Sequence, residues 1–284
     1  MRNYALVGSA IVISSVAVYA DRTGQHFYDP NGGWPDLPPA VTEDQPTIPA
    51  GDENYGARTV ALEQTLLRAE RFPVTVLRPG SIHGRFGHYP REWYFVKRAL
   101  DRRPFRILSQ GGRSRFHTMA AVNLAELIRL AAERPGNRVL NAGDPEPPTV
   151  RQIAATIFAV VGHEAEEIIV AGDPPSPSVG DTLRTVPRAV VMDMSRAAVE
   201  LGYRPVAHYA DAVPDAVPDA VPDAVPDAVP DAVPDAVPDA VDWMVRATRD
   251  AEWEDVFAYF YANQGDAAFD YDAEDRWVAS HHRR

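Results

Sequence analysis

The chain has 284 residues, of which 45% are hydrophobic and 24% charged, as in an ordinary globular protein. It contains no cysteine, which excludes disulfide bonds, thiolate metal sites and cysteine nucleophiles. Its net charge of −12 argues against nucleic acid or an anionic membrane as a partner. Seven tandem copies of Asp-Ala-Val-Pro, residues 211–238, carry seven of the acidic groups, so the rest of the chain has a net charge of −5.

Residues 4–20 form the first apolar stretch, and two interpretations of it remain open. As a buried parallel strand, the β-branched run at residues 10–14 would lie inside a sheet. As a signal peptide, Arg2 would supply the basic region and cleavage would follow Ala20. Two serines in the middle of the stretch and the polar segment after it favour the strand.

Residues 21–54 contain six prolines and a Gly-Gly pair, which predict a long loop. A helix is expected next, because apolar and polar residues recur at helical spacing on one face: Tyr55, Thr59, Leu62 and Leu66. Asn54 is its predicted N-cap. Residues 72–80 then predict a buried strand that Pro79-Gly80 ends. This order of elements predicts an α/β fold with a parallel sheet.

Further elements follow along the chain. Residues 105–108 and 138–141 read as short strands, and Thr149 is the predicted N-cap of a helix that reaches about Val161. Residues 164–187 look variable and are rich in proline and serine.

Four segments together resemble one family. They are residues 13–19 (ISSVAVY), 55–59 (YGART), 77–84 (LRPGSIHG) and 192–205 (MDMSRAAVELGYRP). In this order they resemble successive signatures of the extended short-chain dehydrogenase/reductases, the NAD-dependent epimerase/dehydratase family. The resemblance implies a partial Rossmann-like, doubly wound parallel sheet with a small C-terminal substrate-binding region.

The same resemblance implies roles for individual residues. Ser15 matches the family's catalytic serine or threonine, and Tyr55 matches the tyrosine that exchanges a proton with a substrate hydroxyl. Thr59, Pro79 and Gly80 would lie near the nicotinamide ribose of NAD or NADP. In the family a lysine stands where this chain has Thr59, and threonine supplies no positive charge to a tyrosine whose free pKa is about 10.

Substrate residues follow from the family in the same way. Ser81 and His83 occupy the segment after the buried strand, and Arg115 is the nearest match to an arginine that contacts the phosphate of a nucleotide-sugar. A second interpretation, given equal weight, is that Arg115 belongs to a solvent-exposed basic rim and binds no substrate. His83 and His117 lack a metal-ligand pattern with partner carboxylates, so no metal site is expected. The resemblance implies a small-molecule substrate as the partner. A homodimer is compatible with it, and the expected location is the cytoplasm.

The sequence also departs from the family. The family opens with a strand, a GxxGxxG turn and a helix that bind the pyrophosphate, and no such turn occurs here. By family comparison, Met1 falls near the fifth strand of the sheet, so the resemblance implies that roughly the first third of the usual domain is missing from this sequence. We therefore expect residues 1–205 to be the C-terminal two-thirds of such a domain, 206–241 a low-complexity repeat segment, and 242–284 a helical tail.

Three hypotheses for function follow. The first is an NAD(P)-dependent epimerase, dehydratase or reductase that acts on a sugar-nucleotide or a similar secondary alcohol. The second is a non-catalytic or truncated relative with a defective cofactor site, suggested by Thr59 and the absent glycine turn. The third is a secreted binding protein from which residues 1–20 are removed.

Overall fold

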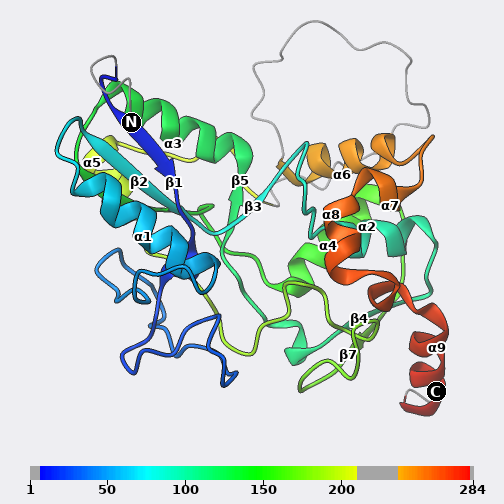
Figure 1. Ribbon diagram of the computed structural model, residues 1–284. Helices are drawn as coiled ribbons and strands as arrows, with labels where there is room; N and C mark the ends of the chain where they lie inside the picture. The colour runs from blue at the N-terminus through cyan, green and yellow to red at the C-terminus, as the bar shows by residue number, and fades with distance from the viewer. Residues whose placement is uncertain (1–6, 210–235, 282–284) are drawn as a thin grey trace, which may run out of the picture. The chain divides into compact units, whose positions relative to one another are not determined.

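The computed structural model describes residues 7–209 and 236–281, and these form two compact units (Figure 1). Unit 1 comprises the described parts of three segments, residues 1–82, 115–147 and 186–206. Unit 2 comprises those of residues 83–114, 148–185 and 207–284. The chain thus enters each unit several times. Contacts between segments distant in sequence produce this division, and local patterns do not reveal them.

Unit 1 contains a sheet of three parallel strands in the order β1–β2–β6: β1, Ala10–Ile13; β2, Val74–Pro79; β6, Arg138–Ala142. The middle strand, β2, is buried along its whole length because strands flank both of its edges. Neighbouring strand residues point to opposite faces. Val76 therefore packs with Leu66 and Leu67 on one face, whereas Leu77 packs with Leu127 on the other.

These contacts place helices on both faces of the sheet. α1 (Tyr55–Leu67) covers one face, and α3 (Ala121–Glu133) and α5 (Ser195–Leu201) cover the other (Figure 1). This arrangement confirms the predicted partial Rossmann-like, doubly wound α/β fold. Two short strands, β3 (Ser81–His83) and β5 (Thr118–Ala120), follow β2 and precede α3.

The first apolar stretch belongs to the folded core of unit 1. β1 pairs with β2, and a 3-10 turn, η2 (Val16–Val18), follows it. Val18, Tyr19 and Ala20 are at most 2% exposed. Cleavage after Ala20 would therefore remove a strand of the sheet and part of the core.

Helix α1 begins as predicted, with Asn54 accepting a hydrogen bond from the Ala57 N–H at 2.9 Å. Tyr55 and Leu62, which share one face of the helix, are 49% and 46% exposed. The buried residues of the helix are Gly56, Ala57, Thr59, Val60 and Glu63. This side of the helix faces inward for two reasons. Gly56 allows close approach of the helix to η2, and Glu63 has a buried partner, Arg78.

Unit 2 contains two parallel strands, β4 (Phe105–Leu108) and β7 (Glu166–Ile169), with Ile107 opposite Ile168. The segment at residues 164–187, rich in proline and serine, thus includes β7, which is formed by pairing with β4. The main apolar cluster joins three helices: α2 (Trp93–Leu100), α4 (Val150–Val161) and α6 (Ala236–Ala247). Four short elements complete the unit: η3 (Gln110–Gly112), α7 (Trp253–Val256), α8 (Ala258–Gln264) and η4 (Asp266–Phe269).

Two local predictions in unit 2 can be compared with the structure. Thr149 caps α4 in a reciprocal capping box with Gln152, as its sequence predicts. Most of the Asp-Ala-Val-Pro repeat lies outside the described residues, but α6 begins in its last copy, at Ala236. Pro238 is tolerated there because the first turn of a helix does not use its N–H groups for intrahelical bonds.

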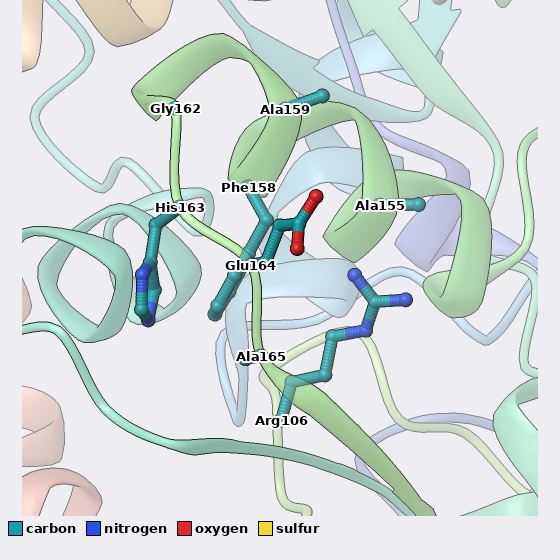
Figure 2. A pocket seen from close by; sticks show the side chains of 8 residues that line it. All are labelled: Arg106, Ala155, Phe158, Ala159, Gly162, His163, Glu164 and Ala165. Carbon is teal, nitrogen blue, oxygen red and sulfur yellow. The ribbon is translucent and has the colours of Figure 1, made fainter.

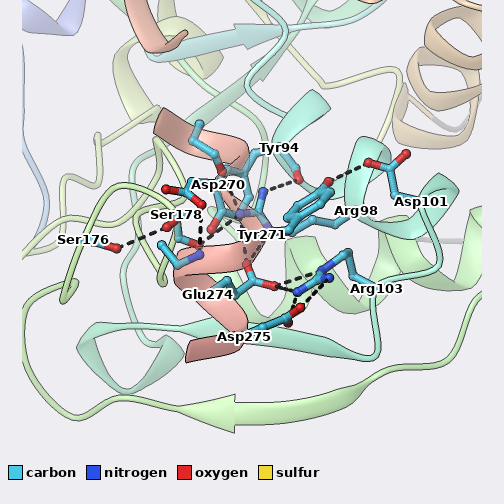
Figure 3. A network of polar contacts seen from close by, with 12 residues as sticks. Tyr94, Arg98, Asp101, Arg103, Ser176, Ser178, Asp270, Tyr271, Glu274 and Asp275 are labelled. Atoms are coloured by element: carbon cyan, nitrogen blue, oxygen red, sulfur yellow. Dashed lines mark hydrogen bonds and ion pairs between the residues drawn. The ribbon is translucent and has the colours of Figure 1, made fainter. Parts of the chain in front are cut away.

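The last helix, α9 (Tyr271–His281), is held to unit 2 by a buried ionic network (Figure 3). Glu274 accepts from the guanidinium of Arg98 at 3.2 Å and from that of Arg103 at 3.0 Å. The side chains of Arg98 and Glu274 are only 2% and 1% exposed. Tyr271 adds a hydrogen bond from its hydroxyl to Asp101 at 2.6 Å. None of the helices in the described ranges is both long and apolar enough to cross a membrane.

Candidate functional site

The predicted proton-handling residues, Ser15 and Tyr55, lie on two backbone turns that pack together in unit 1. The Ser15 hydroxyl oxygen accepts the Ala17 N–H at 3.1 Å and so begins η2. Tyr55 is the first residue of α1, and its ring lies edge-on to that of Tyr28 at 6.4 Å. A Cβ on Gly56 would lie 2.9 Å from the Ala17 carbonyl oxygen, so glycine is what lets the two turns approach.

Thr59 is buried and already uses its hydroxyl inside the helix. It donates to the Tyr55 carbonyl at 2.8 Å, one turn earlier. Arg58, the neighbouring cation, donates from Nη1 to the Asp52 carbonyl at 3.0 Å. The start of α1 therefore keeps the phenol of Tyr55 at the surface without directing either of these side chains to it.

Pro79 and Gly80 stand at the carboxyl end of β2, where a parallel sheet of this type presents its ligand site. The Gly80 N–H donates to the Ala142 carbonyl at 3.0 Å. A Cβ on Gly80 would lie 2.1 Å from the His117 carbonyl oxygen, so only glycine fits. The space beside Gly80 is thus filled by the protein's own backbone.

The three predicted substrate residues have different environments. Ser81 is buried in unit 1, where its N–H donates to the His117 carbonyl at 2.7 Å. Arg115 is exposed in the same unit and donates to the Pro147 carbonyl at 3.2 Å. His83 is the first residue of unit 2, is 4% exposed, and packs against the Tyr209 ring at 4.9 Å.

His117 is a buried histidine to which the sequence assigned no cofactor or substrate role. Its Nε2–H donates to the Asp144 carbonyl at 2.8 Å, and its Nδ1 accepts the Met192 N–H at 2.9 Å. Burial lowers the pKa of His117, so the ring is neutral. It joins three loops at the carboxyl edge of the sheet.

A second feature missed from the sequence is a buried ion pair between α1 and β2. Glu63 and Arg78 have side chains that are 4% and 7% exposed. Arg78 donates to the two carboxylate oxygens of Glu63 from Nε and Nη2, at 3.0 and 2.7 Å. Ser14 donates its hydroxyl to the same carboxylate, and Arg78 Nη1 donates to the Glu43 carbonyl at 3.3 Å. The available signal was a charged residue within the otherwise apolar strand at residues 74–79.

The ionic states of this cluster are fixed by its surroundings. Burial alone lowers the pKa of Arg78, but the hydrogen bonds and charge of Glu63 outweigh it, so the pKa is raised and the guanidinium stays charged. Burial raises the pKa of Tyr19 to about 12, and its neutral hydroxyl donates to Asn141 at 2.6 Å. The phenol of Tyr19 is 0% exposed, which makes it a structural group.

Asn141 and Glu43 attach the long loop to the outer edge of β6. The Glu43 carboxylate accepts the Asn141 N–H at 2.8 Å and lies 3.4 Å from Nε of Arg196. The Asn141 amide donates to the carbonyls of Val41 and Asp193 at 2.8 and 3.1 Å. The loop at residues 21–54, although irregular, is therefore tied to the sheet beside the candidate site.

A surface hollow of about 700 Å³ lies at the C-terminal end of α4 in unit 2 (Figure 2). Its lining residues are Arg106, Ala155, Phe158, Ala159, Gly162, His163, Glu164 and Ala165. No residue predicted to bind cofactor or substrate lines it. Among the residues that the structure describes, no group of three or more side chains is arranged to hold a metal ion.

Comparisons with known proteins show the fold through solved structures alone. No model of a known protein family matches the chain, and a search of curated proteins finds no relative. The UDP-glucose 4-epimerase of Thermotoga maritima with UDP-glucose has a TM-score of 0.55 at 17% identity, over 84% of this chain and 64% of that one.

Two further structures give the same result. The UDP-glucuronic acid 4-epimerase of Bacillus cereus with UDP-glucuronic acid and NAD has a TM-score of 0.52 at 18% identity, over 83% of this chain and 60% of that one. A dTDP-glucose 4,6-dehydratase mutant of Streptomyces venezuelae with NAD bound has a TM-score of 0.53 at 17% identity, over 86% and 62%. This chain thus spans between 60% and 64% of the length of these three proteins. It shares the fold of these nucleotide-sugar epimerases and dehydratases.

Proposed function

We propose that this chain is the substrate-side part of an NAD(P)-dependent enzyme that oxidises or reduces a secondary alcohol carbon of a sugar-nucleotide. The observation that carries the proposal is the packing of the Ser15 turn against the first turn of α1. It puts a hydroxyl and an exposed phenol on adjoining turns beyond the carboxyl end of β1. Ligands bind at this edge in open parallel sheets.

The chain's own residues would handle the proton. The Ser15 oxygen already accepts an N–H, which leaves its hydroxyl hydrogen for a substrate oxygen. Tyr55 would take the proton from that oxygen when the alcohol is oxidised and return it on reduction. Bound NAD(P) supplies a hydride acceptor or donor. Tyr55 and the acceptor oxygen of Thr59 would be the groups available to its nicotinamide end, since the Gly80 N–H already donates to the Ala142 carbonyl.

The fit to the whole cofactor is incomplete. No GxxGxxG turn stands before a helix in this sequence to bind the pyrophosphate. The Thr59 hydroxyl already donates to a backbone carbonyl, so it has only acceptor capacity for a ribose. These two observations favour a second candidate, a relative of the same fold that binds a sugar-nucleotide without transforming it.

One experiment separates the candidates. The purified chain is incubated with NAD or NADP and with UDP-glucose, UDP-glucuronic acid or dTDP-glucose, and cofactor reduction and sugar products are followed. Turnover that Tyr55→Phe abolishes supports the enzyme. Calorimetric binding of a sugar-nucleotide without turnover supports the binding protein. Turnover that Tyr55→Phe leaves unchanged contradicts the assignment of Tyr55.

A further inference from the structure

We propose that the Glu63–Arg78 pair, together with Ser14, is a positioning unit that fixes Tyr55 relative to the turn of Ser15. The roles of Ser15 and Tyr55 rest on the proposed function. The positioning itself rests on geometry, and its main test does not require catalysis.

The start of α1 packs closely on η2, since a Cβ on Gly56 would lie 2.9 Å from the Ala17 carbonyl oxygen. The C-terminal end of the helix packs on β2 through apolar side chains, and such packing is non-directional. Glu63 lies seven residues after Gly56, about 10 Å along the axis at 1.5 Å per residue. Its bonds to Arg78 and Ser14 connect the helix to the ends of β2 and β1. These directional bonds would fix the rotation of the helix about its axis and with it the direction of its first turn.

The contact between Glu63 and Arg78 is directional because it is a bidentate ion pair. A planar guanidinium that meets both carboxylate oxygens constrains angle as well as distance. Arg78 is itself fixed by a third bond, from Nη1 to the Glu43 carbonyl at 3.3 Å. Replacing a buried ion pair by apolar side chains of similar volume is often neutral for stability. What this pair contributes beyond packing is therefore the orientation of α1.

The pair acts on Tyr55 by position and not by charge. Glu63 neutralises Arg78 at contact distance, so the two together present little net charge to the start of the helix. The family's lysine, by contrast, would act by charge. Loss of the pair should therefore alter the surroundings of Tyr55 without adding or removing a net charge.

The test uses the full chain with 3-fluorotyrosine incorporated at position 55 alone and observed by ¹⁹F NMR. The main variant is Glu63→Leu with Arg78→Met, which keeps volume and removes the directional bonds. The matched control, Arg98→Met with Glu274→Leu, removes the equally buried pair that holds α9. We expect the resonance to shift or broaden in the main variant while the melting temperature is retained, and to stay unchanged in the control.

An unchanged resonance in the folded main variant overturns the proposal, as does an equal change in the control. If the main variant does not fold, the single variants Ser14→Ala and Arg78→Lys replace it, since each removes part of the hydrogen bonding to Glu63. An unchanged resonance in both of these variants overturns the proposal. Where the chain turns over a sugar-nucleotide, kcat should fall about tenfold or more with KM nearly unchanged. A shifted resonance without any turnover leaves the positioning intact and contradicts the proposed enzyme.

Discussion

The hydroxyl of Thr59 donates a hydrogen bond to the backbone carbonyl of Tyr55 at 2.8 Å, one helical turn before it. The sequence resemblance predicts a lysine at the position of Thr59. The side chain therefore stabilises the helix and contributes no charge to the phenol. Glu63, one further turn along the helix, forms an ion pair with Arg78.

Thr59→Lys should restore that charge. An ammonium at position 59 lies on the face of α1 that carries Tyr55, one turn away. A cation at this range favours the phenolate, so the catalytic limb of the pH–rate profile should move down by about one to three pH units. Thr65 makes the same bond, to the Ala61 carbonyl at 2.7 Å, but is exposed further along the helix. Thr65→Lys should leave the profile in place, and an equal shift there would show a nonspecific charge effect.

Binding of NAD and NADP to this chain should be weak. The sequence has no glycine turn for the pyrophosphate, so the adenosine diphosphate half of the cofactor should add little affinity. Isothermal titration calorimetry should give similar, weak affinities for NAD and nicotinamide mononucleotide. A low-micromolar dissociation constant for either dinucleotide would contradict this expectation.

Protonation of His117 should destabilise unit 1. Its pKa is lowered by burial, and a proton on Nδ1 would remove the acceptor of the Met192 N–H. A group whose pKa is depressed in the folded state stabilises the fold above its unfolded pKa, here about 6.5, and this stability is lost as the pH falls. Urea unfolding should show lower stability of His117→Gln at neutral pH and a shallower decline below about pH 6.5. The exposed His88 serves as the control, since His88→Gln should keep the wild-type slope.

Gly80→Ala should destabilise the fold, because the added methyl group would lie 2.1 Å from the His117 carbonyl oxygen. Overpacking of this kind typically costs about 1–3 kcal/mol in the free energy of unfolding. A Cβ on Gly8, in the same unit, meets nothing within 4 Å. Gly8→Ala should therefore change stability by less than about 1 kcal/mol, and equal losses in the two variants would refute the steric explanation.

Shortening the repeat by whole copies should have little effect on unit 2. The copies are identical, so deleting residues 215–234 still leaves Asp-Ala-Val-Pro directly before Asp239 and preserves the first turn of α6. Loop-closure entropy changes slowly with length, which limits the expected effect to about 1 kcal/mol. Deleting all of residues 211–238 also removes the start of α6 and should lower the melting temperature further. A large loss from the shorter deletion would show that the repeat packs on the protein.

Features that depend on neighbouring residues were predictable from the sequence. Asn54 and Thr149 cap their helices because a short polar side chain reaches the N–H groups two or three residues on. β2 was recognised as a buried strand from its apolar run, and the order of elements indicated the parallel α/β fold. The order of elements along the chain also put Ser15 just after β1, and Tyr55 at the start of the helix that follows the long loop.

Features that depend on distant partners were decided by the tertiary structure. Glu63 meets Ser14 across 49 residues of sequence and Asn141 meets Tyr19 across 122, so neither pairing leaves a periodic pattern. The buried side of α1 includes Glu63, a charged residue that can be buried because Arg78 pairs with it. β7 is a strand because β4 supplies its partner, and its own residues carry too little signal. Local propensity thus determined where elements begin, whereas burial of charge and strand pairing, which require a partner, determined how they pack.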